Sequence, residues 1–161
     1  MINKKINKLS PSIVFLSFFG SGFTPKAPGT AGSILSVPFL YVLAISKISP
    51  PIIWAILILL TIYSSYLAHL VQTKYEVHDP QWIVIDEVLG MITTWLFYPS
   101  ASIVHLLIVL ILFRFFDIVK IWPARYFDKK VNHGAGTILD DIISGIYAGV
   151  SYFLLIRYVK F

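Results

Sequence analysis

The sequence contains no cysteine and few charged residues. Without cysteine, the chain has no thiol nucleophile, no thiolate metal site and no disulfide framework. Charged residues make up 13% of the 161 positions and hydrophobic residues 57%, whereas about 25% of the residues in soluble domains are charged. This composition excludes an ordinary soluble domain and a disordered chain. It indicates a small polytopic membrane protein, with one domain over residues 1–161.

The net charge of +5 has two interpretations. A basic balance is typical of nucleic-acid-binding proteins, but in so apolar a chain it favours contact with anionic lipid head groups. We therefore expect membrane lipids, and no nucleic acid, as partners. The N-terminal segment 1–19 has three lysines ahead of a short apolar run, and we expect it to lie on the membrane surface. A cleaved signal peptide is the alternative for this segment.

Long stretches without charge predict an all-α membrane bundle. Residues 27–46, 48–73, 88–113 and 142–156 carry no charged side chain. About 20 apolar residues of helix cross a bilayer, and Tyr98-Pro99-Ser100 predicts a tight turn within the third stretch. We expect five hydrophobic helices, near residues 29–46, 51–72, 83–98, 101–120 and 138–157. The third helix is short, and we expect some helices to be tilted or only partly inserted.

The order of these helices places the acidic residues on one face. The loops 20–28, 73–82 and 121–137 fall on the same side of the membrane, and all eight acidic residues lie in these loops or close to them. Ten of the 13 lysines and arginines share that side, which makes it cytoplasmic by the positive-inside rule. We therefore expect a single site at the cytoplasmic face.

Two acidic pairs are candidate metal ligands. Asp86 and Glu87 begin the third predicted helix, and Asp140 and Asp141 begin the last one. Carboxylates among apolar residues are costly and repel each other unless a cation compensates them, and Mg²⁺ prefers carboxylate, water and phosphate oxygens. For each pair alone, acids favoured by a helix N-terminus are the alternative. Two pairs on one face favour the metal site.

A charged stripe lies at the cytoplasmic end of the fourth predicted helix. Arg114, Asp117 and Lys120 recur at every third position and share one helix face. Arg114 and Lys120 are candidates for binding phosphate oxygens, and Asp117 is a candidate base or further metal ligand. An intrahelical salt bridge is the alternative interpretation.

A glycine-rich loop precedes the first hydrophobic helix. Its glycines, Gly22 and Gly29 among them, allow backbone N–H groups to converge on an anion, and the Thr30 hydroxyl fits the start of that helix. A simple turn is the alternative. Lys26 in this loop is a further candidate, as is His78, whose pKa range suits proton transfer.

Together, four motifs in order resemble the phosphatidylglycerophosphatase A family. They are GSGFTPKAPGTAGS, IVIDEVLG, FRFFDIVK followed by WP, and GAGTILDD before IISGIYAG, and they extend from about Gly20 to Gly149. The family usually has proline directly after the lysine of the third motif, where this chain has Ile121. The motif positions carried over are Gly22, Pro28, Gly29, Thr30, Asp86, Glu87, Arg114, Asp117, Lys120, Pro123, Asp140 and Asp141.

The resemblance implies an all-α, Mg²⁺-dependent phosphatase of the bacterial cytoplasmic (inner) membrane, with its active site facing the cytoplasm. The implied substrate is phosphatidylglycerophosphate, an anionic phospholipid, and the products are phosphatidylglycerol and phosphate. The expected metal ligands are Asp86, Glu87, Asp140 and Asp141, the expected catalytic residues are Asp86, Asp117 and Asp141, and the expected phosphate-binding residues are Arg114, Lys120, Gly22, Gly29 and Thr30. The nucleophile, water or an aspartate, stays open. A small cation- or proton-coupled transporter is the alternative function, although its acids would be expected near the middle of spans.

Overall fold

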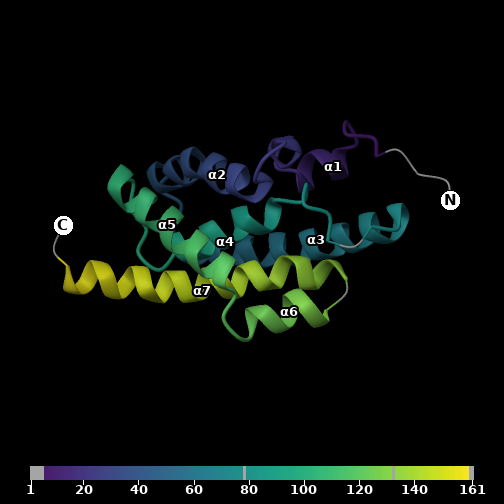
Figure 1. Ribbon diagram of the computed structural model, residues 1–161. Helices are drawn as coiled ribbons and strands as arrows, with labels where there is room; N and C mark the ends of the chain where they lie inside the picture. Colours follow the sequence, from purple (N-terminus) through teal and green to yellow (C-terminus); the bar gives the residue numbers. More distant parts are fainter. Residues whose placement is uncertain (1–5, 78, 132, 160–161) are drawn as a thin grey trace.

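The computed structural model describes residues 6–77, 79–131 and 133–159, which form seven α-helices and a short 3₁₀ helix with no strand among them (Figure 1). The predicted all-α class is confirmed. In chain order the elements are α1 (Pro11–Leu16), η1 (Ser21–Phe23), α2 (Pro28–Ile45), α3 (Pro50–Tyr75), α4 (Ile85–Trp95), α5 (Ile103–Val119), α6 (Ala124–Lys130) and α7 (Gly134–Tyr158).

The five expected hydrophobic helices are α2, α3, α4, α5 and α7. Proline stands in the first turn of α2 and α3, where its missing N–H would have no intrahelical partner and its ring angle already suits a helix. The third predicted helix is shorter than expected, because α4 ends at Trp95 and the chain turns before Tyr98.

The short helix α4 lies at the centre of the bundle, between α2, α3, α5 and α7 (Figure 1). Every residue of α4 except Glu87 is buried. Small residues let it approach α7: a Cβ on Gly145 would lie only 2.6 Å from the carbonyl oxygen of Gly90. The Thr94 hydroxyl donates to the Gly145 carbonyl at 3.2 Å across the same contact. Close backbone packing of this kind is typical of helices in membranes, and here it holds the middle and the end of α4 against α7.

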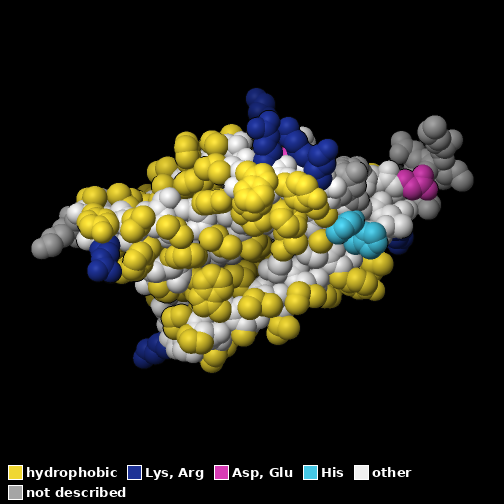
Figure 2. Space-filling model, turned by 90° about the horizontal axis from the view of Figure 1, so that it is seen from below, with side chains coloured by type: hydrophobic (Ala, Val, Ile, Leu, Met, Phe, Trp, Pro, Cys, Tyr) yellow, Lys and Arg dark blue, Asp and Glu magenta, His cyan; other side chains and the backbone are white. Residues whose placement is uncertain are grey.

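Among the residues that the structure describes, three helices are long and apolar enough to cross a membrane, namely α2, α3 and α7. The helix α4 has 11 residues and rises only about 16 Å, and α5 has 17 residues. Hydrophobic side chains cover most of the face shown in Figure 2, as expected for contact with lipid. The described part of the chain thus combines full-length candidate spans with a short central helix that those spans surround.

Two expectations about the C-terminal half are wrong in detail. Asp140 and Asp141 do not begin the last helix, because α7 starts at Gly134 and the pair lies in its second turn. The sequence predicts a loop for the glycines before this pair, but Gly134 belongs to α7 and packs against α3. A Cβ there would lie 2.2 Å from the backbone nitrogen of His69 on α3. In addition, the expected loop 121–137 contains the amphipathic helix α6.

The described part of the N-terminal segment packs against the rest of the bundle. Its helix α1 buries Ile13 and Leu16, and it packs against α3. The backbone N–H of Val84 donates to the carbonyl of Leu16 at 2.9 Å, which ties this segment to the residues that lead into α4.

Candidate active site

The ends of several helices enclose a polar pocket of about 470 Å³. The first turn of α2, the first turn of α4, the last turn of α5 and the second turn of α7 contribute side chains, and the segment 79–83 closes another side. Charged side chains dominate its lining: Asp79, Asp86, Glu87, Arg114, Asp117, Lys120, Asp140 and Asp141. The pocket therefore gathers six of the eight acidic residues of the chain beside two basic ones.

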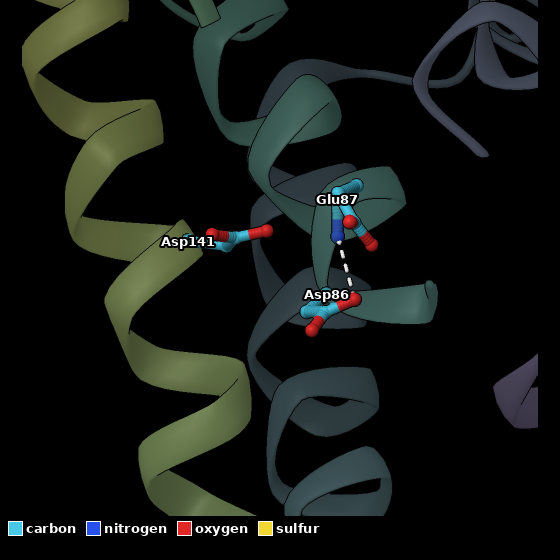
Figure 3. A group of neighbouring side chains, drawn as sticks. All are labelled: Asp86, Glu87 and Asp141. Atoms are coloured by element: carbon cyan, nitrogen blue, oxygen red, sulfur yellow. Dashed lines mark hydrogen bonds between the residues drawn. The ribbon is translucent and has the colours of Figure 1, made fainter. Parts of the chain in front are cut away.

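Asp86, Glu87 and Asp141 form a three-carboxylate cluster in this pocket (Figure 3). One oxygen from each residue lies within 4.8 Å of the others. Asp86 and Glu87 extend from the first turn of α4, and Asp141 points toward them from α7. The backbone N–H of Glu87 donates to Asp86 Oδ1 at 3.0 Å. Carboxylates this close repel one another, and a cation bound among them would remove the repulsion.

Two carboxylate oxygens of the pocket residues are buried without a hydrogen-bond partner in the described part of the chain. They are Glu87 Oε2 and Asp140 Oδ1. Because buried polar atoms in folded proteins almost always have partners, these oxygens indicate a site for a bound group. Carboxylate oxygens are the ligands that Mg²⁺ prefers, together with water and phosphate oxygens. The donor set therefore fits the divalent cation that the sequence resemblance implies.

Arg114 brings positive charge to the cluster. Its Nη1 lies 2.6 Å from Asp117 Oδ2, one turn further along α5, and 4.0 Å from Glu87 Oε1. The same nitrogen donates weakly to Ser33 Oγ on α2, at 3.5 Å. The Nε of Arg114 is buried and has no partner among the residues that the structure describes. A guanidinium held by neighbours, with a donor left over, suits a phosphate oxygen.

The start of α2 approaches the carboxylates closely. A Cβ on Gly29 would lie 2.1 Å from Glu87 Oε1 and 3.3 Å from Arg114 Nη1, so only glycine leaves room here for both side chains. Backbone N–H groups in the first turn of a helix have no intrahelical partner, and they favour anions. The first turn of α2 is thus a second candidate for anion binding, beside Arg114.

Lys120 occupies another part of the pocket, at the end of α5. Its ammonium donates to Asp128 Oδ1 at 2.8 Å and to Asp140 Oδ2. Burial alone would lower the pKa of Lys120, but the charge of Asp140 and the hydrogen bonds to Asp128 and Asp140 outweigh burial and raise that pKa above its ordinary value. Lys120 is therefore a permanent cation, paired with acids from α6 and α7.

Comparisons with known proteins point to one family. The family model described as phosphatidylglycerophosphatase A matches residues 14–156. The chain is 37% identical over 152 residues to the phosphatidylglycerophosphatase A of Haemophilus influenzae, which covers 94% of this chain and 93% of that protein. It is 36% identical over 138 residues to the protein of the same name from Escherichia coli, covering 84% of this chain and 78% of that protein. No solved structure matches the chain.

The chain belongs to the phosphatidylglycerophosphatase A family. The resemblance seen in the sequence is confirmed, and the protein is an enzyme, a phosphatase that hydrolyses a phosphate monoester. The apolar helices make it a membrane protein. Membership in an enzyme family sets the transporter alternative aside. The acids of the pocket lie near helix ends or, in the case of Asp79, in the segment between α3 and α4.

Three sequence candidates among the described residues, Lys26, Thr30 and Gly22, do not line the pocket. Lys26 is exposed, and Thr30 lies in the first turn of α2 outside the lining. Gly22 is buried under the segment that closes the pocket, where a Cβ would lie 2.0 Å from the carbonyl oxygen of Trp82. Gly22 thus supports the pocket wall through packing. His78 lies outside the described residues.

Sequence reasoning missed other lining residues and contacts. Asp79, Gln81 and Thr137 line the pocket, and Ser33 contacts Arg114. Ser33 and Thr137 lie inside motifs that resemble the family, and that was the signal available for them. The partner of Thr137, Gln72 on α3, donates to its hydroxyl at 3.0 Å, a contact across 65 positions that no local pattern indicates.

Proposed function

We propose that this protein hydrolyses phosphatidylglycerophosphate to phosphatidylglycerol and inorganic phosphate, with Mg²⁺, at the cytoplasmic face of the bacterial inner membrane. The observation that carries the proposal is the juxtaposition of the cluster Asp86, Glu87 and Asp141 with Arg114 in one pocket. A cation site beside a guanidinium is suited to a phosphate monoester. The two relatives named phosphatidylglycerophosphatase A support the choice of this lipid.

The carboxylate cluster would hold the metal. Asp86, Glu87 and Asp141 would supply its protein ligands, and the second oxygen of Glu87 stays available for the same purpose. When bound, Mg²⁺ supplies charge stabilisation for the phosphate oxygens as the bond to the leaving oxygen breaks. Asp140 would offer its unpartnered Oδ1 as a further metal ligand from the other side of the pocket.

Arg114 would bind and orient the phosphate. Asp117 and Ser33 hold one end of the guanidinium, so the N–H donors of Arg114 that these contacts leave over would bind the phosphate without a large entropic cost. The N–H groups at the start of α2 would add donors to the same anion. Asp117 is our candidate for the base that accepts a proton from an attacking water.

The reaction then balances as a simple hydrolysis. A water oxygen forms a bond to phosphorus, the bond from phosphorus to the glycerol oxygen breaks, and that oxygen takes a proton to become the hydroxyl of phosphatidylglycerol. One proton of the water passes to a pocket carboxylate and from there to the glycerol oxygen, and the other proton stays on the inorganic phosphate. The excess of lysine and arginine in the loops beside the pocket supports the cytoplasmic orientation and an anionic lipid substrate.

The experiment is phosphate release from phosphatidylglycerophosphate in detergent micelles by the purified protein. We expect release that requires Mg²⁺, stops with a chelator and returns when Mg²⁺ is added back. Asp86→Asn and Asp141→Asn should each lose at least about 100-fold in rate, because each removes a charged metal ligand. Glu76→Gln is the matched control, because Glu76 is an exposed acid at the end of α3. Equal rates with and without Mg²⁺, or full activity in both Asn variants, would contradict the proposal.

A further inference from the structure

The contacts of Lys120 assign a role to a residue that the sequence motifs do not single out. Asp128 lies on α6, eight positions beyond Lys120, and its Oδ1 accepts a hydrogen bond from the Lys120 ammonium at 2.8 Å. Both side chains are about a quarter exposed, whereas the side chain of Asp140, the other acceptor, is 5% exposed. The ammonium thus lies between an acid at the rim and an acid inside the pocket.

An ammonium group has three N–H donors. Two of them go to Asp128 and Asp140, which leaves one for a ligand in the pocket that Lys120 and Asp140 both line. A lysine side chain is flexible and has no preferred fork geometry. Without Asp128, Lys120 would keep only the hydrogen bond to Asp140 among those of the described residues, and the ammonium would be free to settle against both Asp140 oxygens.

We propose that Asp128 is a positioning residue, which holds Lys120 so that its third N–H donor meets a phosphate oxygen of the substrate while Asp140 keeps one oxygen free. The proposal rests on the proposed function, because the ligand is the phosphate of a phospholipid monoester. It is consistent with the unpartnered state of Asp140 Oδ1 in the described part of the chain. Asp128 itself touches no substrate and acts only through Lys120.

A double-mutant cycle on kcat and KM tests this role. In the parent background, we expect Asp128→Asn to raise KM about three- to tenfold, and Asp128→Ala to raise it by roughly tenfold or more, with a smaller change in kcat. The effect stays below that of a fully buried charged hydrogen bond, because both partners are partly exposed. In a Lys120→Met background, either change should alter KM by less than about twofold, since the residue through which Asp128 acts is gone.

Several results would overturn the proposal. A merely structural role for Asp128 would lower the amount of active enzyme, so that kcat falls while KM stays constant, and it would do so equally in the Lys120→Met background. An unchanged KM in Asp128→Asn would overturn the proposal as well. If Asp128→Ala does not fold, Asp128→Asn carries the test, because it keeps the shape and one acceptor oxygen. If Lys120→Met turns over too slowly, the same cycle is measured as the Kd of a short-chain phosphonate analogue.

A control variant and the activity of the parent enzyme separate this proposal from the proposed function. Glu76→Gln removes an exposed acid outside the pocket lining, and we expect the same small effect in both backgrounds. If the parent releases no phosphate from phosphatidylglycerophosphate, the proposed function fails. If the parent is active and the effects of Asp128 and Lys120 are additive, only the positioning role fails.

Discussion

The contact between the start of α2 and Glu87 allows the carboxylate cluster to be displaced without removing any charge. In Gly29→Ala, the added methyl carbon would lie 2.1 Å from Glu87 Oε1, where carbon and oxygen need at least 3.0 Å. Glu87 is the flexible partner, so its carboxylate must move by about 1 Å. Displacement of a reacting or ligating group by that distance costs roughly 100-fold in rate.

The same substitution should leave the fold intact. Gly29 lies in the first turn of α2, and alanine is favoured over glycine in a helix by up to about 1 kcal/mol. We therefore expect the thermal unfolding midpoint in detergent to stay constant or to rise slightly, while phosphate release at saturating Mg²⁺ falls by about 100-fold. Circular dichroism on heating and a phosphate-release assay measure the two effects on one preparation.

Gly149→Ala is the matched control, with the opposite pattern. Gly149 lies far along α7 from the pocket, and the added methyl carbon would lie 2.2 Å from Cδ2 of the Phe97 ring. Overpacking of this kind costs about 1–3 kcal/mol in stability, so the unfolding midpoint should fall while kcat of the folded enzyme stays near the parent value. Full activity in Gly29→Ala, or activity lost only in proportion to unfolding, would refute the placement of Glu87 at the reacting centre.

Further predictions concern the cation and the guanidinium. Mg²⁺ should raise the thermal unfolding midpoint of the parent, and Asp141→Asn should lose most of that shift. In chelator, Asp141→Asn should be at least as stable as the parent, because it removes one of three mutually repelling carboxylates. A full Mg²⁺ shift in this variant would place the cation elsewhere. Arg114→Lys should lower kcat/KM by tenfold or more in steady-state assays, because lysine keeps the charge but lacks the planar guanidinium, whose separate N–H groups can contact Asp117 and Ser33 and still leave donors for phosphate. Ser33→Ala should cost less than about threefold, since its hydrogen bond to Arg114 is long at 3.5 Å; equal losses in these two variants would contradict this geometry.

The sequence was sufficient to predict the five hydrophobic helices, because the length of an apolar run decides whether a helix can lie in lipid, but it did not predict the short helices α1 and α6. It failed at Gly134, where glycine in a motif suggests a loop but in fact permits the backbone of α7 to touch α3. A close approach of two helices depends on a partner 65 positions away in the chain, and no local pattern shows that partner. For the same reason, the short contact between Gly29 and Glu87 could be found only from the folded structure.

The two acidic pairs show a further limit of sequence reasoning, because neighbours in a helix point about 100° apart. Asp140 and Asp141 look equivalent in the motif, yet Asp141 joins Asp86 and Glu87, whereas Asp140 accepts a hydrogen bond from Lys120. Both side chains are buried in the second turn of α7, and each meets a different partner. One motif therefore supplies both a metal-ligand candidate and the partner of the pocket lysine.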